Sequence, residues 1–300
     1  MKMKKFFSAV VIFAVAVLGA AEMKVLTIGN SFSWSLQEHF PKIAKAQGDT
    51  LKLAFANHGG CSIQRHWKYV TEEEADPAKK YYSLNKKKAK LREVLASEKW
   101  DIISIQQVSH RSYVKGSFYP ELDKLVAYVK KYAPKSRIVF QQTWSYRTDS
   151  AYYQRRKIDQ KKMDEGIEAN YKEASKKFGF DVIPTGIAVK IARAEQKETF
   201  VPMTSAAKKA LKEGENPVEK GSFCVGYVWR KNKKTGKIAL SFDPSHLNSR
   251  GRYLQACVWY GFVFKKSPLE IKYNGKLAPA DAAFLRQCAD KALKANTFKK

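Results

Sequence analysis

Ser31, Asp243 and His246 are the side chains whose types and spacing could perform chemistry together. Ser31 follows an apolar run at 24–28 and the turn residue Gly29, which predicts a buried strand that ends just before the serine. In open α/β sheets, ligands bind at the carboxyl ends of the strands. His246 lies three residues after Asp243, and a histidine oriented by a carboxylate can activate a serine hydroxyl. The simpler alternative is an ordinary turn at Ser31, with Asp243 capping a helix and His246 packing locally.

The chain resembles the SGNH (GDSL-type) hydrolases at both of these places. Gly29-Asn30-Ser31-Phe32 resembles the first sequence block of that family, and Asp243-Pro244-Ser245-His246-Leu247 resembles the last. More closely, the chain is similar to a group of exported bacterial SGNH-like proteins, DUF4886. The resemblance covers nearly the whole mature chain and rests on four short blocks. It implies that Ser31 is the nucleophile, that His246 is the base and that Asp243 orients the base.

The second block, residues 57–62, contains a glycine turn. In the family, a backbone N–H of this block stabilises the oxyanion of the tetrahedral intermediate, and a glycine lets the main chain approach the substrate closely. The resemblance therefore implies that the N–H groups of Ser31 and Gly60 form the oxyanion hole, with Gly59 as the second choice for the glycine. The alternative is a glycine turn that binds no ligand.

The third block departs from the family pattern. Most members carry Gly-x-Asn-Asp after the third strand, and the asparagine side chain donates to the oxyanion. This chain has Gln106 and Gln107 at that point and no such asparagine. A glutamine amide offers the same donor on a longer arm. We expect Gln106, at the strand end, to take this role, because Gln107 would point to the opposite side of a strand.

Strand and helix patterns alternate along the chain, which predicts βαβ units and a mostly parallel sheet. With the resemblance, this gives an α/β fold: a flavodoxin-like three-layer sandwich of the SGNH type. We predict strands at 24–28, 50–56, 100–106, 136–143 and 180–183, and helices at 35–47, 63–70, 84–97, 119–132, 151–178, 251–264 and 279–295. The alternation stops at about 195–240, where a β-hairpin formed by 223–230 and 237–242 indicates an insertion or lid. One hydrolase-like domain at 22–300 is the economical division.

The N-terminus has the pattern of a targeting segment. Lys2, Lys4 and Lys5 precede an apolar run at 6–18, and small residues follow it at 19–21. The run is short for a membrane span, so we predict a cleaved secretory signal at residues 1–21, a secreted or periplasmic protein and no stable membrane anchor. A retained anchor helix is the alternative.

The formal charge of the chain is +28, of which three lysines belong to the predicted signal, leaving +25 for the mature protein. Such a charge favours polyanionic partners. The lysines are spread over many predicted elements, which is typical of a solvated surface rather than one basic groove. An acidic polysaccharide is the polyanion that we consider, and we expect no nucleic acid.

The sequence predicts neither a metal nor a cofactor. The cysteines Cys61, Cys224, Cys257 and Cys288 contain no Cys-x-x-Cys pair, and the spacing of the histidines matches no strong zinc motif. Export takes a protein into an oxidising environment where disulfides form, and the sequence alone leaves the pairing of these cysteines open.

These features lead to one expected activity and two rivals. The expectation is a secreted serine esterase with a Ser-His-Asp triad that removes acyl groups, most simply acetyl, from a carbohydrate; this substrate class rests on the resemblance and on export. The rival of another class is a non-catalytic polyanion- or glycan-binding protein on the same fold, suggested by the charge and the missing asparagine. A lipase or thioesterase is the rival of the same class, and the lack of a long apolar lid disfavours it.

Overall fold

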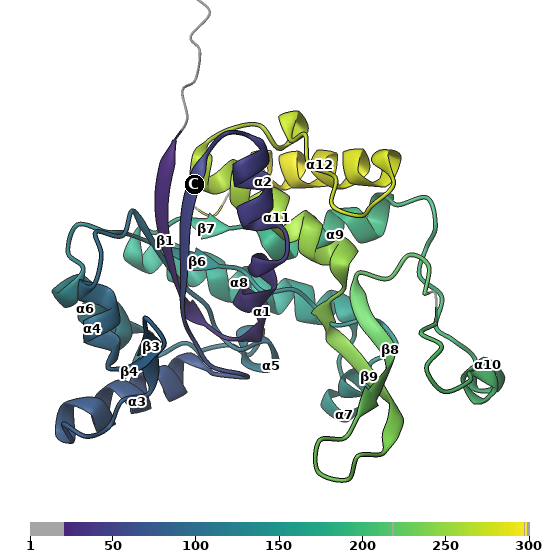
Figure 1. The fold of residues 1–300 in the computed structure, drawn as a ribbon, viewed down its shortest axis with the longest axis horizontal. Coiled ribbons are helices and arrows are strands. Elements are labelled where there is room, and N and C mark those ends of the chain that lie inside the picture. The colour runs from purple at the N-terminus through teal and green to yellow at the C-terminus, as the bar shows by residue number, and fades with distance from the viewer. Residues whose placement is uncertain (1–20, 218, 297, 299–300) are drawn as a thin grey trace, which may run out of the picture.

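A five-stranded parallel sheet forms the centre of the protein (Figure 1). The computed structural model describes residues 21–217, 219–296 and 298. The strands lie in the order β2-β1-β5-β6-β7. Their bounds are β1 Glu22–Gly29, β2 Thr50–Asn57, β5 Ile102–Ile105, β6 Arg137–Gln141 and β7 Val182–Ile183. The chain winds outward from β1 in both directions, so the strand order reverses between β1 and β5, where such sheets bind ligands.

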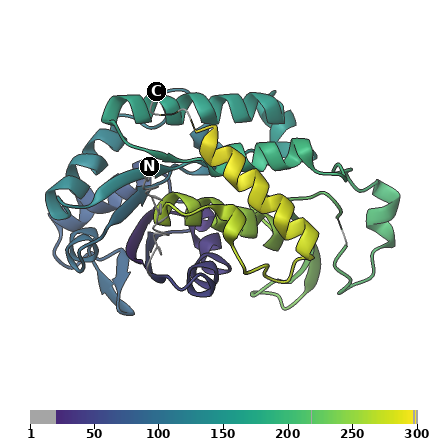
Figure 2. The same cartoon turned by 90° about the horizontal axis from the view of Figure 1, so that it is seen from above.

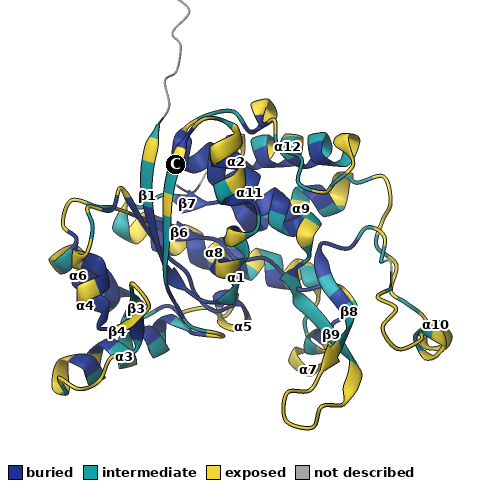
Figure 3. Ribbon diagram, viewed as in Figure 1, coloured by how far each residue is buried: buried dark blue, intermediate teal, exposed yellow. Residues whose placement is uncertain are grey.

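Helices cover both faces of this sheet, as Figures 1 and 2 show. On one face lie α2 (Phe40–Ala46), α9 (Thr185–Glu195), α11 (Ser249–Phe264) and α12 (Pro279–Lys294). On the other lie α3 (Ile63–Ala75), α4 (Leu91–Ala96), α6 (Glu121–Tyr132) and α8 (Gln160–Phe178). This arrangement confirms the predicted three-layer α/β sandwich. Helix α11 is apolar on all sides because α2, α9 and α12 pack around it, and Figure 3 shows it buried.

Two of the predicted helices are wrong: one is largely a β-hairpin, and the other is divided into two helices. The helix predicted at 84–97 is a β-hairpin, β3 (Tyr82–Leu84) and β4 (Lys87–Ala89), followed by the short helix α4. Asn85 and Lys86 both adopt positive φ, 51° and 65°, which is the backbone of a two-residue hairpin turn. The helix predicted at 151–178 is divided into α7 (Ala151–Arg156) and α8, because Lys157 turns left-handed and Asp159 caps α8 by accepting from the N–H of Lys162.

The predicted hairpin insertion is present between α9 and α11. After α9 the chain forms the small helix α10 (Ser205–Ala210) and then the antiparallel pair β8 (Cys224–Lys231) and β9 (Ile238–Leu247). Strand β9 extends five residues further than predicted, so Asp243 and His246 lie on its last part rather than in a turn before a helix.

The remaining elements are short: α1 (Ser31–Trp34), η1 (Ser35–Gln37), α5 (Ser109–Ser112) and η2 (Pro268–Glu270). Within the described part of the chain, no helix is both long and apolar enough to cross a membrane. The predicted signal at 1–21 lies outside the described residues except for Ala21, so its cleavage stays a prediction.

Candidate active site

Ser31 lies at the carboxyl end of β1, where the strand order of the sheet reverses. Strand β1 ends at Gly29, and Ser31 is the first residue of α1. The buried side chain of Asn30 shapes the turn: its Oδ1 accepts from the N–H of Phe32 at 3.1 Å, and its Nδ2 donates to the carbonyl of Cys61 at 3.0 Å. The N–H of a first helical residue has no partner inside its own helix. Ser31 therefore presents both its hydroxyl and an N–H without a partner inside α1, at the position expected from the sequence.

The structure brings Ser31, His246 and Asp243 into one chain of hydrogen bonds. The distance from Ser31 Oγ to His246 Nε2 is 2.7 Å. The other ring nitrogen, His246 Nδ1, lies 2.9 Å from Asp243 Oδ2 and 3.0 Å from Asp243 Oδ1. This is the relation of a nucleophile, a base and a carboxylate that orients the base. The sequence spacing of Ser31 and His246, 215 residues, is bridged because β9 ends beside α1.

The surroundings of Asp243 keep its carboxylate charged. Burial acts to raise its pKa, but hydrogen bonds from the ring and the backbone N–H of His246, and from the N–H of Ser245, outweigh burial and hold the pKa of Asp243 well below its usual range. The two backbone donors both reach Oδ1, from His246 at 3.1 Å and from Ser245 at 3.3 Å. Arg230 lies 3.3 Å from Oδ2. The carboxylate can therefore stabilise a positively charged imidazole beside it.

Aromatic packing fixes the end of β9 over the nucleophile. Phe32 stacks on Trp144 with ring centroids 4.1 Å apart, and its ring also meets the His246 ring edge-on at 5.4 Å. The indole N–H of Trp144 donates to the carbonyl of Ser245 at 2.9 Å. Trp144 is almost completely buried, and this hydrogen bond holds the end of β9 next to His246. The position of Trp144 just after β6, at the same edge of the sheet, is the signal in the sequence that places it near the site.

Gln106 lies behind the nucleophile turn and is 1% exposed. Its Oε1 accepts a hydrogen bond from the Ser33 hydroxyl, and its Nε2 donates to Asn30 Oδ1 at 3.3 Å. A Cβ atom at Gly29 would approach Gln106 Oε1 to 3.0 Å, so the side chain fills the space directly against the turn. The Gln106 amide is therefore buried and already bonded to Asn30, and the oxyanion contact expected for it stays a prediction.

Gln107 lies apart from the nucleophile and is fully buried. Its Oε1 accepts from the N–H of Ile63 at 3.0 Å, at the start of α3, and its Nε2 donates to the carbonyl of Ser117 at 2.9 Å. Gln107 thus anchors α3. The two adjacent glutamines have separate sets of partners, as expected at the end of a strand.

The glycine turn of the second block lies against the nucleophile turn. Asn57 ends β2 and donates to the carbonyl of Asn30 at 3.3 Å, and Cys61 accepts from Asn30 as described above. Gly60 is exposed and has φ +57°, and a Cβ atom there would meet nothing within 4 Å. The backbone conformation, rather than tight packing, therefore explains the glycine. The oxyanion roles of the Gly60 and Ser31 N–H groups stay predictions.

The active-site hollow has a volume of about 250 Å³. It is lined by Ser31, Phe32, Trp34, Ser35, Trp144, His246, Leu247 and Arg252. The guanidinium of Arg252 lies 2.7 Å from Glu38 Oε2, so its charge is paired. Ser31 and His246 therefore line an open hollow with both aromatic and polar walls.

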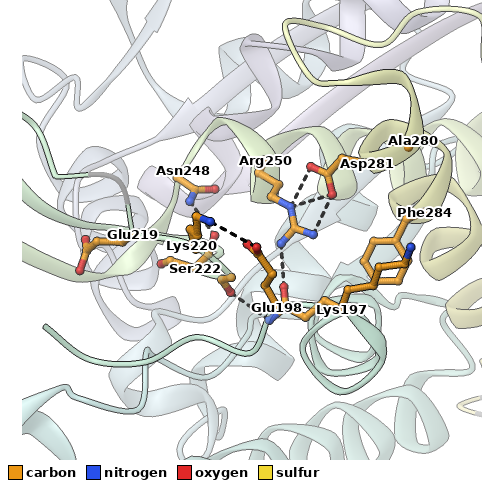
Figure 4. Close-up of a pocket in the computed structure, with 12 residues that line it drawn as sticks. Lys197, Glu198, Glu219, Lys220, Ser222, Asn248, Arg250, Ala280, Asp281 and Phe284 are labelled. Carbon is orange, nitrogen blue, oxygen red and sulfur yellow. Dashed lines mark hydrogen bonds and ion pairs between the residues drawn. The ribbon is translucent and has the colours of Figure 1, made fainter.

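A larger hollow of about 590 Å³ lies between the insertion and α12 (Figure 4). Four of its charged groups pair with one another: Arg250 with Asp281 at 2.8 Å, and Lys220 with Glu198 at 3.4 Å. It contains no member of the triad. Size alone therefore does not identify the reactive site, and we assign the candidate site to the smaller hollow at Ser31.

His66 and the four cysteines are buried in the fold and take no part in the triad. The ring of His66 is completely buried between the carbonyl of Gly29, at 2.9 Å from Nε2, and the hydroxyl of Tyr82, at 3.0 Å from Nδ1. Burial lowers the pKa of His66 to about 3, so the ring is neutral at physiological pH. The four cysteines, all among the described residues, are buried and unpaired. In the described residues, no group of three His, Cys, Asp or Glu side chains could hold a metal ion.

The comparisons with known proteins agree with the fold. A crystal structure of a DUF4886 family protein from Bacteroides uniformis ATCC 8492 is 26% identical, covers 93% of this chain and 96% of its own, and has a TM-score of 0.70. A putative SGNH hydrolase from Slackia heliotrinireducens (17% identity, 79% and 96% coverage, TM-score 0.49) and an acetyl xylan esterase (11%, 80% and 100%, TM-score 0.44) are more distant. No curated protein matches the chain. The family model "Domain of unknown function (DUF4886)" matches residues 24–201, more than half of the chain, and the protein therefore belongs to the DUF4886 family.

Proposed function

We propose that the protein is an exported serine esterase that removes short acyl groups, most simply acetyl, from a carbohydrate. The observation that carries this proposal is the hydrogen-bonded chain from Ser31 through His246 to Asp243, in a hollow at the carboxyl edge of the sheet. These three groups are what ester hydrolysis through an acyl-enzyme requires.

The reaction would proceed in two steps on these side chains. His246 Nε2 accepts the proton of Ser31 as Oγ attacks the ester carbonyl, and Asp243 stabilises the imidazolium that forms. The N–H groups of Ser31 and Gly60 are the proposed donors to the oxyanion. The imidazolium then protonates the departing alcohol, leaving an acyl group on Ser31. In the second step His246 takes a proton from water, and the resulting attack releases the acid and regenerates the serine.

The lining of the hollow supports a short acyl group. Few apolar side chains line the hollow, chiefly the nearly buried Phe32, Trp144 and Leu247, and its volume is about 250 Å³. A long hydrocarbon chain would need a longer apolar surface than these side chains offer. This disfavours the lipase and thioesterase alternatives.

The surface beside the serine supports a carbohydrate alcohol. Trp34, on the rim of the hollow, is 39% exposed, although large aromatic side chains are usually covered. An exposed indole gives a sugar ring a flat apolar surface to pack against. The predicted secretory signal would place the enzyme where polysaccharides are encountered.

Hydrolysis of p-nitrophenyl acetate by the mature protein tests the proposal. We expect turnover by the wild-type protein and its loss in Ser31→Ala, with an unchanged melting temperature. Labelling by a fluorophosphonate, located by mass spectrometry, should modify Ser31 alone. Ser241→Ala is a control, because it removes a hydroxyl from the same strand, β9, without touching the triad. Equal turnover by the wild-type and Ser31→Ala proteins would refute the mechanism.

The same experiment separates the second candidate function. The charge of +28 favours a polyanion-binding protein without catalysis. A protein that binds acidic glycan but neither hydrolyses the ester nor reacts with the fluorophosphonate would be of this kind. We prefer the esterase because binding alone does not require a serine, a histidine and a carboxylate in hydrogen-bond contact.

A further inference from the structure

A second hollow of about 450 Å³ adjoins the active-site hollow, and Trp34 lines both. Its walls include Trp34, Phe55, Tyr81, Tyr82, Lys86 and Lys88. Phe55 lies near the carboxyl end of β2, and the others except Trp34 belong to the β3–β4 hairpin or directly precede it. In Figure 1 this hairpin and the β8–β9 hairpin lie on opposite sides of α1. A ligand in the second hollow would therefore extend away from Ser31, on the side opposite the insertion.

The hairpin is firmly connected to the nucleophile turn. The Tyr82 hydroxyl bonds to His66 Nδ1 at 3.0 Å, and His66 Nε2 bonds to the carbonyl of Gly29 at 2.9 Å. Tyr81 is also held, because its ring stacks on Tyr69 at 4.2 Å and its hydroxyl donates to Glu72. Aromatic surfaces with fixed positions recognise a ring at little entropic cost. The hollow thus has a defined position relative to Ser31.

The charge of this hollow is entirely positive. Lys86 and Lys88 line it, and its lining contains no aspartate or glutamate. Neither lysine has a carboxylate within ion-pair distance among the described residues, whereas Lys24 and Lys52 on the neighbouring strands both pair with Glu98. Lys87 lies between them in sequence but does not line the hollow, as the alternation of side chains along a strand requires. The two lysines are therefore cations without an internal partner on a wall made of aromatic rings.

We propose that this hollow is a subsite for a sugar that carries a carboxylate, a uronic acid residue of the glycan whose ester group reaches Ser31. Trp34 and Tyr81 pack against the ring, and Lys86 and Lys88 bind the carboxylate. The proposal rests on the proposed function in that it names the substrate class of the same site. Binding to the subsite, however, needs no turnover and can be measured separately.

Titration calorimetry with two unacylated trisaccharides tests the subsite. We expect the wild-type protein to bind trigalacturonic acid more tightly than neutral xylotriose, and to lose this preference between about 0.05 and 0.5 M NaCl as the charges are screened. The double variant Lys86→Gln/Lys88→Gln should bind trigalacturonic acid about 3- to 10-fold more weakly, the range for two exposed ion pairs, while its affinity for xylotriose is unchanged. Lys87→Gln is the matched control, because it removes one charge from the same hairpin outside the hollow.

Each outcome decides the proposal. Equal affinity for the two trisaccharides at low salt would overturn the proposal. A loss of affinity for trigalacturonic acid in Lys87→Gln as large as that in the double variant would also overturn it, since general surface charge would then explain the binding. The salt comparison needs only the wild-type protein and holds even if a variant fails to fold. Failure of the esterase is a separate result: p-nitrophenyl acetate would not be hydrolysed while the acidic trisaccharide still bound in a lysine-dependent way.

Discussion

Asp243→Asn tests how the carboxylate acts on the histidine, and the structure determines which way the new amide should face. Asp243 Oδ1 accepts from the N–H groups of His246 and Ser245, so an asparagine should keep its carbonyl oxygen there. Its NH₂ group would then occupy the place of Oδ2, 2.9 Å from His246 Nδ1. Two donors cannot face each other, and the retained oxygen, 3.0 Å from Nδ1, already accepts from two backbone N–H groups and the Ser245 hydroxyl. We therefore expect Nδ1 to lose its proton and Nε2 to carry one. A protonated Nε2 cannot accept the proton of Ser31.

The expected effect is a large loss of kcat at nearly constant stability. The wrong tautomer costs a serine hydrolase about 10⁴ in kcat, which corresponds to roughly 5 kcal/mol in the activation barrier. The backbone hydrogen bonds survive in the asparagine variant, so its melting temperature should stay close to that of the wild-type protein. Asp243→Ala removes those bonds as well and should be the less stable variant.

Steady-state hydrolysis of p-nitrophenyl acetate, with melting curves for each variant, provides the measurement. A kcat of Asp243→Asn within about tenfold of the wild-type value would refute the tautomer argument. A smaller loss in Asp243→Asn than in Asp243→Ala would also count against it, because an alanine leaves the histidine free to adopt the productive tautomer.

Two further predictions concern buried side chains behind the site. Gln106→Ala should lower stability by about 1–3 kcal/mol, as measured by urea unfolding, since it removes two buried hydrogen bonds and leaves the Ser33 hydroxyl only Gln141, and Asn30 Oδ1 only the N–H of Phe32, as partners; a kcat loss of about 10²–10³ at unchanged stability would instead support the oxyanion role. His66 has a folded-state pKa of about 3, below its unfolded value near 6.5, so its contribution to stability is present above pH 6.5 and is lost as the pH falls towards 3. The wild-type protein should accordingly lose more stability between pH 7 and pH 4 than His66→Gln, and parallel pH profiles would contradict this.

The parts of the fold that follow from hydrophobic patterning could be predicted from the sequence. The strand before Gly29 and the helix after Asn248 bury continuous apolar runs, and both were found where expected. The meeting of Ser31 with His246 could be anticipated because a serine needs a base, and because the order of the motifs resembled a known family. These inferences depend on residue type and spacing alone.

The details that depend on single backbone angles or on tertiary partners could not be predicted. The turn of the β3–β4 hairpin requires positive φ at Asn85 and Lys86, and neither residue is a glycine. The surrounding run of lysines instead favours a helix by propensity. The break at Lys157 has the same cause. The partners of the Gln106 side chain, Ser33 and Asn30, could not be predicted because they are distant in sequence and carry no pattern that indicates them.

Asp243 and His246 lie on β9, more than 40 residues beyond the end of the part of the chain that the family model matches, 24–201. The nucleophile, the aromatic rings and the two lysines of the second hollow all lie within that region. A relative recognised through it alone could therefore have a complete sugar-binding surface and a serine with no base to activate it. Replacement of the two residues on β9 would remove the proposed base and leave the sheet and the proposed sugar subsite unchanged, so a survey of such relatives must inspect the second hairpin before it assigns any of them an enzymatic reaction.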